Sequence, residues 1–269
     1  MYLLIQTYHE KNIDRLNELI LCIISNLENV NVNKVINLCE GNHDNYLPSV
    51  IRNHPKYMCK NGFERLTYKK AFEYSNENLD NEIIGLINTD IMLVEDFKIN
   101  ELDKFLVKNT VIANSRYEID LSTSKIFLDE TFKRMYHAHT QDAWFYRTPI
   151  NVNDCDFELG LVGCDNAIAH RFKNSGYNVF NMVERFKIIH VDSSRGKNST
   201  NFNTFHKENE IKQNIINKHP ENTGSLLVPN YDIVSKMSLD KLLEMFNYNE
   251  QEKVLLITQI MSDKIKIKN

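Results

Sequence analysis

Short apolar runs alternate with segments of helical spacing along the first part of the chain. Residues 2–7 (YLLIQT) and 34–39 (KVINLC) are continuous apolar runs that are typical of buried strands. Between them, residues 11–27 carry apolar side chains at helical spacing, and Asn12 or Asp14 is placed to cap the start of that helix. A strand–helix–strand unit of this kind forms a parallel pair with a right-handed crossover. The pattern therefore predicts an α/β fold from the first residues onward.

The same alternation continues as far as about residue 195. It predicts strands at 82–87, 111–113, 142–146 and 188–191, and helices at 68–75, 99–107 and 166–175, the last closed by Gly176. Residues 41–62 are turn-rich and residues 115–136 are mixed, so neither segment is assigned to an element. We expect a mixed, mostly parallel sheet flanked by helices over residues 1–204, and a helical C-terminal extension over residues 205–269.

Composition narrows the class of protein. The net charge of -4 gives no electrostatic reason to expect nucleic acid or an anionic membrane as a partner. The five cysteines never stand at the two-residue spacing of zinc sites, which favours reduced thiols in a cytoplasmic protein. No apolar stretch approaches the length of a membrane span, so we expect no transmembrane segment. Nucleotide-triphosphatase, dinucleotide-binding, zinc-protease and nucleophile-elbow motifs are also absent.

Asn88-Thr89-Asp90 follows the apolar strand predicted at 82–87. Ligands of open α/β sheets bind beyond the carboxyl ends of the strands, and a carboxylate there can hold a hard divalent cation. An aspartate in this position can equally well form a turn or cap a helix. Both interpretations of Asp90 stay open on this evidence.

Three other places carry candidate chemistry. Asp165 stands before the helix predicted at 166–175, where it or Asn166 caps the helix or faces a cleft as an acceptor ligand or general base. Asp142 lies beside Trp144, which is either a core aromatic residue or a wall for sugar stacking. His190 ends the last strand, where a lone histidine is usually structural. It becomes a candidate metal ligand only if the fold brings it to Asp90, because imidazole and carboxylate together suit Mn²⁺.

Six short motifs follow one another in order along about residues 1–196. They are Arg65-Leu66-Thr67-Tyr68, Asn88-Thr89-Asp90-Ile91, Ser115-Arg116-Tyr117, Gln141-Asp142-Ala143-Trp144, Gly163-Cys164-Asp165-Asn166 and Ile188-Ile189-His190-x-Asp-Ser-Ser-Arg195. In this order they resemble a group of bacterial and large-virus glycosyltransferases. The ordered set is more specific than any one of its members.

The resemblance implies a GT-A fold in which a nucleotide diphosphate sugar binds across the first strand–helix–strand unit. It implies that Asp90 is the last acidic residue of a degenerate Asp-x-Asp motif for Mn²⁺ or Mg²⁺, with His190 as the second protein ligand. Because Asn88 stands at the first acidic position of that motif, only one carboxylate is offered there. The other implied site residues are Thr7, Tyr8, Glu40, Arg65, Tyr68, Asn88 and Thr89 for the nucleotide, and Asp142 and Asp165 for the sugar and acceptor.

The expected activity is metal-dependent transfer of a sugar, with uridine diphosphate as the carrier, to a glycan or another hydroxyl acceptor. The alternative is a non-catalytic module on the same fold that binds a nucleotide sugar or a glycan. A sugar nucleotidyltransferase is disfavoured, because residues 6–10 (QTYHE) lack the glycine-rich basic loop that holds a triphosphate. The sequence leaves open the sugar, the acceptor, retention or inversion at the anomeric carbon, and whether the chain forms a homo-oligomer.

Overall fold

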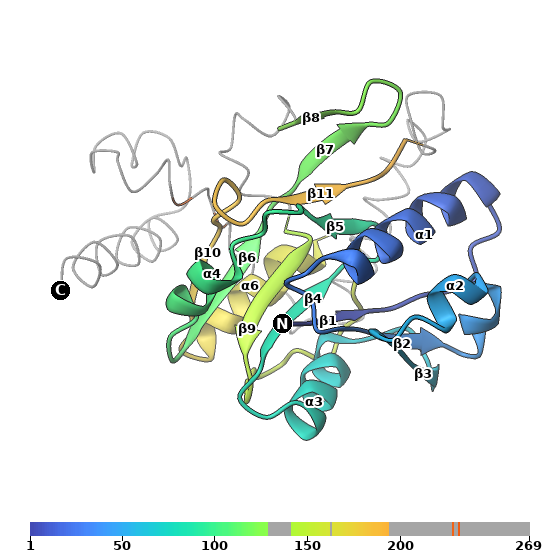
Figure 1. The fold of residues 1–269 in the computed structure, drawn as a ribbon. Coiled ribbons are helices and arrows are strands. Elements are labelled where there is room, and N and C mark those ends of the chain that lie inside the picture. The colour runs from blue at the N-terminus through green and yellow to red at the C-terminus, as the bar shows by residue number, and fades with distance from the viewer. Residues whose placement is uncertain (129–140, 162, 194–227, 229–230, 232–269) are drawn as a thin grey trace.

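A seven-stranded sheet with helices on both faces forms the centre of the molecule, seen in a computed structural model (Figure 1). The structure describes residues 1–128, 141–161, 163–193, 228 and 231. In spatial order the strands are β10 (Asn178–Phe180), β6 (Thr110–Asn114), β9 (Ala143–Arg147), β4 (Ile83–Ile87), β1 (Tyr2–Ile5), β2 (Lys34–Glu40) and β3 (Tyr57–Phe63). The α/β class and the central sheet flanked by helices agree with the prediction from the sequence.

The direction of the strands places the candidate residues at one edge of the sheet. β1 pairs in parallel with β2 and with β4, and β2 pairs in parallel with β3. β9 lies antiparallel between β4 and β6. The end of β4 and the start of β9 therefore adjoin, with Ile87 opposite Ala143. The turn after β4 and the residue before β9, Asp142, consequently meet.

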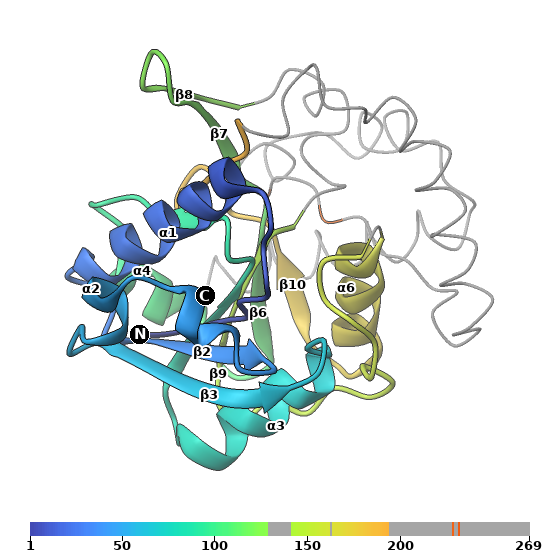
Figure 2. The same cartoon turned by 90° about the vertical axis from the view of Figure 1, so that its right-hand side faces the viewer.

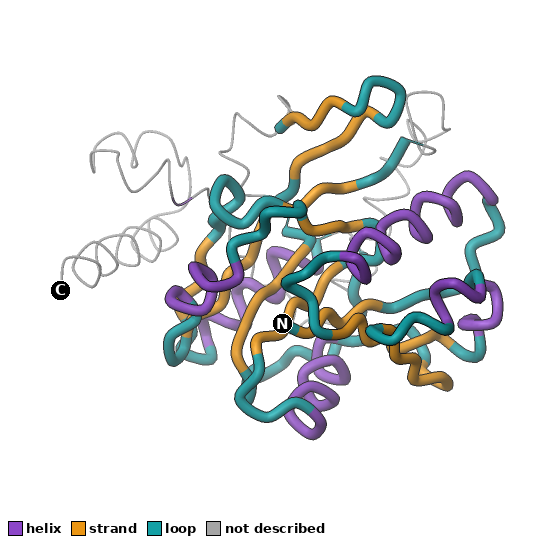
Figure 3. The backbone as a smooth tube through the Cα atoms, in the orientation of Figure 1, coloured by secondary structure: helices purple, strands orange, loops and turns teal. Residues whose placement is uncertain are grey.

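A second, four-stranded sheet stands beside the first (Figure 3). Its order is β5 (Ile91–Leu93), β11 (Ile188–His190), β7 (Tyr117–Asp120) and β8 (Lys125–Phe127). β11 pairs antiparallel with β5 and parallel with β7, in a register that sets His190 opposite Ile91 on one side and Glu118 on the other. Residues 88–90 thus connect the two sheets and lie next to His190.

Two apolar cores cover the two faces of the main sheet, and helices lie on both sides of that sheet (Figure 2). α3 (Tyr68–Asn78) and α6 (Cys164–Asn174) contribute to one core, and α1 (Ile13–Glu28), α2 (Ser49–Arg52) and α4 (Ile99–Phe105) contribute to the other. Leu4 packs in the first core while Leu3 and Ile5 pack in the second. β1 is buried on both faces, which explains why its sequence is continuously apolar.

The prediction from the sequence missed several elements at the edges of the sheets. Residues 41–62 contain a short 3₁₀ helix, η1 (His43–Tyr46), as well as α2 and most of β3. β3 is an edge strand with exposed and half-buried side chains, so it has no apolar pattern to detect. β7 and β8 lie within residues 115–136, the segment that was left unassigned. Their side chains are also half-buried or exposed, so they show no apolar pattern. The other predicted strands and helices are confirmed with small shifts at their ends.

Most of the predicted C-terminal extension, residues 205–269, lies outside the described residues, and so does the domain boundary near 204. The two described residues of this part pack against the main body: Val228 belongs to the first core and Tyr231 to the second. Asn181 joins both, because its Nδ2 donates to the Val228 carbonyl at 3.0 Å and its carbonyl accepts from the Tyr231 amide at 2.7 Å. All five cysteines are unpaired, as predicted. In the described part of the chain no helix has the length and apolar character needed to cross a membrane.

Asn12 caps α1, the helix that carries Arg15 into the candidate site. Its Oδ1 accepts from the amides of Asp14 at 3.0 Å and Arg15 at 3.3 Å. We predict that Asn12→Ala lowers the free energy of unfolding by about 1 kcal/mol, whereas Asn12→Asp, which retains a capping oxygen, changes it little. Urea denaturation measures the difference, with Lys11→Ala as the neighbouring surface control. Equal midpoints for the Asn12→Ala and Lys11→Ala variants would contradict the role of the cap.

Candidate active site

A polar cavity of about 260 Å³ lies at the carboxyl ends of β1 and β4, where the two sheets meet. Its lining joins the loop after β1, the start of α1, the turn 88–90, the start of β9 and the end of β11. The side chains that matter for chemistry are Tyr8, Arg15, Arg65, Asn88, Thr89, Asp90, Arg116, Asp142, His190 and Asp192. A larger hollow of about 730 Å³ near α4 contains none of the candidate residues.

The three side chains of the turn after β4 make separate contacts. The Thr89 hydroxyl donates to the Gln6 carbonyl at 2.5 Å, which ties the turn to the loop after β1. Asn88 Nδ2 donates to Asp142 Oδ1 at 2.9 Å, and its backbone amide donates to the Asp142 carbonyl at 3.1 Å. Asp90 faces the second sheet. Asn88 therefore positions Asp142.

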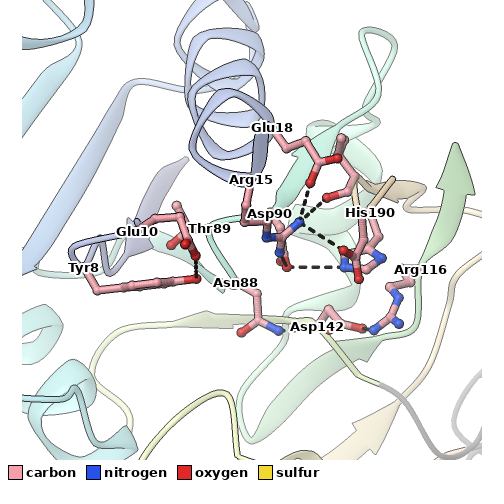
Figure 4. A network of polar contacts seen from close by, with 12 residues as sticks. Tyr8, Glu10, Arg15, Glu18, Asn88, Thr89, Asp90, Arg116, Asp142 and His190 are labelled. Carbon is pink, nitrogen blue, oxygen red and sulfur yellow. Dashed lines mark hydrogen bonds and ion pairs between the residues drawn. The ribbon is translucent and has the colours of Figure 1, made fainter. Parts of the chain in front are cut away.

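The Asp90 carboxylate lies between two cationic groups (Figure 4). Arg15 donates to its Oδ2, and the same guanidinium donates to Glu18 at 2.9 Å and to the Val191 carbonyl at 2.6 Å. His190 Nε2 lies 3.3 Å from that Oδ2. His190 and Asp90 are 100 positions apart in the chain, but the fold brings their side chains together. That proximity is the condition under which the sequence made His190 a candidate metal ligand.

His190 is buried between two carboxylates. Its Nδ1 lies 2.8 Å from Glu118 Oε2, opposite the contact of Nε2 with Asp90. Burial lowers the pKa of His190, but hydrogen bonds with Asp90 and Glu118 outweigh burial and raise that pKa to about 9. The site thus attracts positive charge at the position of the imidazole.

Asp142 is held by partners on both of its oxygens. Oδ1 accepts from Asn88, and Oδ2 accepts from Arg116 Nη1 at 2.6 Å. Arg116 also donates through Nε to Glu118 Oε1 at 2.8 Å. The pKa of Glu118 is lowered, because hydrogen bonds with His190 and attraction to both cations outweigh the effect of its burial. Both cations of this part of the site are thereby paired with carboxylates.

Asp165 lies in the first turn of α6 and does not cap it. The N-cap is Gly163, with φ +86° and no capping side chain, so the prediction that Asp165 or Asn166 caps the helix was wrong. Burial, followed by the negative charge of Asp142, raises the pKa of Asp165 to about 6. Asp165 is not among the residues that line the 260 Å³ cavity, but it hydrogen-bonds with the backbone of Gln141, the residue before Asp142, which does line the cavity. A carboxyl group with this pKa is suited to accept a proton near neutral pH.

The residues assigned to the nucleotide fall into two groups. Tyr8 and Arg65 line the cavity, with the Arg65 guanidinium 6.0 Å from the Tyr8 ring centroid and bonded to the Leu159 carbonyl. Thr7 is buried and its carbonyl accepts from the Glu40 amide at 3.0 Å, just outside the lining. Tyr68 is fully buried, which corrects the expectation that it lies at the nucleotide.

The core explains both Tyr68 and Trp144. Their rings pack edge to face with centroids 5.2 Å apart, and Trp144 is 1% exposed. Trp144 is therefore a core residue and offers no surface for sugar stacking. The helix that Tyr68 opens still matters to the site, because it fixes the backbone after Arg65.

Three residues of the site had no assigned role in the sequence: Arg15, Arg116 and Glu118. Arg15 stands three residues before Glu18 on one helix face, a spacing that signals an ion pair but not its link to Asp90. Arg116 belongs to one of the ordered motifs, but that motif gives no partner for it. Glu118 carries no local signal, since its contacts depend on the pairing of β7 with β11.

The donor types at Asp90 and His190 suit a divalent cation once His190 has lost its Nε2 proton, which the metal would have to displace. A carboxylate oxygen and an imidazole nitrogen suit Mn²⁺, and a second carboxylate on the far ring nitrogen, here Glu118, orients such a histidine. The described residues contain no cluster of three or more histidine, cysteine, aspartate or glutamate side chains arranged for a metal. Among the described residues, Asp90 and His190 would supply two ligands, and a bound diphosphate and water could supply others.

Comparisons with known proteins do not assign a family. No family model matches the chain, and no curated protein matches its sequence. Among solved structures, the chain is similar to the crystal structure of S. aureus TarS 1-349, with 14% sequence identity and a TM-score of 0.45. The match covers 80% of this chain and 65% of that one. Similarity at this level carries no functional assignment, so function has to be inferred from the site.

The raised pKa of Asp165 makes a prediction about stability and pH. Because the pKa is higher in the folded protein than in the unfolded chain, the folded state loses stability as pH rises from about 4 to about 6. We expect Asp165→Asn, which cannot ionise, to be more stable than the wild type by about 2 kcal/mol at pH 7.5 and about equally stable at pH 4. Urea denaturation at both pH values tests this, with the exposed Asp156→Asn as control. A gain that is the same at both pH values would contradict the burial of an ionised Asp165.

Proposed function

We propose that the protein transfers a sugar from a nucleotide diphosphate sugar, carried by uridine diphosphate, to a hydroxyl acceptor. The observation that carries this proposal is the 3.3 Å approach of His190 to Asp90 beside Asp142, at the carboxyl ends of the strands. Those residues come from three of the six ordered motifs that resemble glycosyltransferases. Their meeting in one polar cavity is what a common catalytic role requires.

The donor half of the proposed site consists of Asp90, His190 and the cations around them. Asp90 and His190 would hold Mn²⁺ or Mg²⁺, and that ion would stabilise the negative charge that develops on the diphosphate leaving group. Arg15 holds the Asp90 carboxylate in place, and Arg65 lies across the cavity beside Tyr8. Thr7, Tyr8, Glu40, Asn88 and Thr89 form the proposed surroundings of the nucleotide.

The acceptor half of the proposed site divides two tasks between two carboxylates. Both oxygens of Asp142 accept hydrogen bonds from the protein, which favours an orienting role toward the sugar or acceptor. Burial raises the pKa of Asp165 to about 6, and Asp165 is the proposed general base. The acceptor oxygen attacks the anomeric carbon, the bond from that carbon to the diphosphate breaks, and the hydroxyl proton passes to Asp165.

Ligand-dependent stability tests the donor half. A ligand present at 100 times its Kd stabilises the folded state by about 2.7 kcal/mol. For this chain, we predict a rise in Tm of about 5 °C or more with uridine diphosphate and Mn²⁺ together, and a smaller rise with either alone. Asp90→Asn and His190→Ala should each abolish the effect of the metal, while the control Asp156→Asn keeps it. If no nucleoside diphosphate shifts the Tm with any divalent metal, the donor site is refuted.

Turnover tests the acceptor half and separates an enzyme from a binding module. Release of uridine diphosphate from a uridine diphosphate sugar reports transfer to water even when the natural acceptor is unknown. We predict that Asp165→Asn lowers kcat about 100-fold or more while leaving the donor-induced Tm shift intact, because loss of a general base impairs the reaction and not donor binding. Binding of the donor without any release by the wild type would support the non-catalytic alternative instead.

A further inference from the structure

Glu118 contacts both halves of the proposed site with one carboxylate. Oε2 lies 2.8 Å from His190 Nδ1, and Oε1 accepts from Arg116 Nε at 2.8 Å. The backbone fixes the first of these contacts, because Glu118 and His190 are direct partners in the register of β7 and β11. Its side chain is 20% exposed, so water competes little for either oxygen.

The contacts of Glu118 belong to a ring of polar contacts that is closed through the backbone of the turn 88–90. From Asp90 the ring runs to His190, through Glu118 to Arg116, and on to Asp142. Asp142 then bonds to Asn88, which lies two residues before Asp90 in the same turn. A ring of this kind has one geometry in which every contact is made, so displacement of one member disturbs its neighbours.

We propose that Glu118 is a positioning residue that orients His190 for the donor and, through Arg116, orients Asp142 for the acceptor. This inference rests on the proposed function, since it assigns a task to Glu118 within that reaction. Histidine ligands of metals commonly bond through their other ring nitrogen to a carboxylate, and loss of that partner weakens metal binding or activity 10- to 100-fold. The structure adds that the same carboxylate also holds the arginine bonded to Asp142.

Glutamine at position 118 separates shape from hydrogen bonding. Its side chain has nearly the same volume, but it presents one carbonyl oxygen and one amide group where glutamate presents two acceptors. The amide group would face a donor at either His190 Nδ1 or Arg116 Nε. Glu118→Gln therefore breaks one of the two links whichever way the amide turns. Arg116→Lys removes the forked contact with Glu118 and Asp142, which a single ammonium group cannot reproduce, but it leaves both partners of the Glu118–His190 contact in place.

The experiment compares wild type, Glu118→Gln and Arg116→Lys by two readouts. Calorimetry measures the affinity for Mn²⁺ in the presence of uridine diphosphate, and release of uridine diphosphate from UDP-glucose gives kcat and KM. Glu101→Gln is the matched control, since Glu101 also pairs with an arginine, Arg185 at 3.5 Å, but lies on α4 away from the cavity.

We expect Glu118→Gln to lower Mn²⁺ affinity or kcat at least 10-fold, and Arg116→Lys to lower kcat at least 10-fold with a much smaller loss of Mn²⁺ affinity. The control should match the wild type. If wild type binds Mn²⁺ and turns over and both variants stay within twofold of it, the role of Glu118 is refuted while the proposed function stands. If wild type binds no Mn²⁺ in the presence of uridine diphosphate, the donor proposal and this inference both fail. Should Glu118→Gln not fold, the split between kcat and Mn²⁺ affinity in Arg116→Lys decides the question alone.

Discussion

The charge of Asp90, held out of bulk water, is the constraint on which the rest of the site depends. A buried carboxylate without a partner costs several kcal/mol, so this one requires cations on the elements around it. Arg15 comes from α1 and His190 from β11, and both reach Asp90 because α1 packs against the turn and the short second sheet. Asn26 of α1 reinforces that packing by bonding to the backbone of Ile91 and Leu93. Placement of one charge therefore fixes a helix, a turn and a strand relative to one another.

The two sheets divide the work of positioning these residues. The main sheet ends β4 at the turn and begins β9 after Asp142, which sets Asn88 against Asp142. The second sheet sets His190 between Asp90 and Glu118 through the pairing of β11 with β5 and β7. Neither sheet alone could bring all of these groups together. The cavity lies at the junction of the two sheets, where Asn88 and Asp142 next to the main sheet and His190 of the second sheet all line it.

Sequence periodicity predicted the long buried elements and missed the exposed edge strands and the three-residue strands β5 and β10, which are too short to show a pattern. β1, β4 and α1 have apolar patterns because both faces of those strands and one face of that helix lie in the cores. β3 has no such pattern because it forms an edge of the main sheet. In the site, Asp90, Asp142 and His190 were identifiable because each follows, precedes or ends an apolar strand. Glu118 could not be identified from the sequence. Its contact with His190, 72 positions away, depends on the register of two strands and has no local sequence pattern.

Asp165 shows why the role of a carboxylate depends on its surroundings more than on its position in a motif. Asp142 and Asp165 both come from motifs of the same family resemblance and lie close enough for the charge of one to raise the pKa of the other. Both oxygens of Asp142 accept hydrogen bonds, from Asn88 and from Arg116, whereas burial and the charge of Asp142 act on Asp165. Two nearby carboxyl groups with unlike partners can be given different tasks, so we propose that Asp142 orients a substrate while Asp165 takes a proton. Glu118 ties Arg116 to His190, the proposed metal ligand. The carboxylate whose charge acts on the proposed base is thus connected, through one arginine and one glutamate, to the geometry of the proposed metal site.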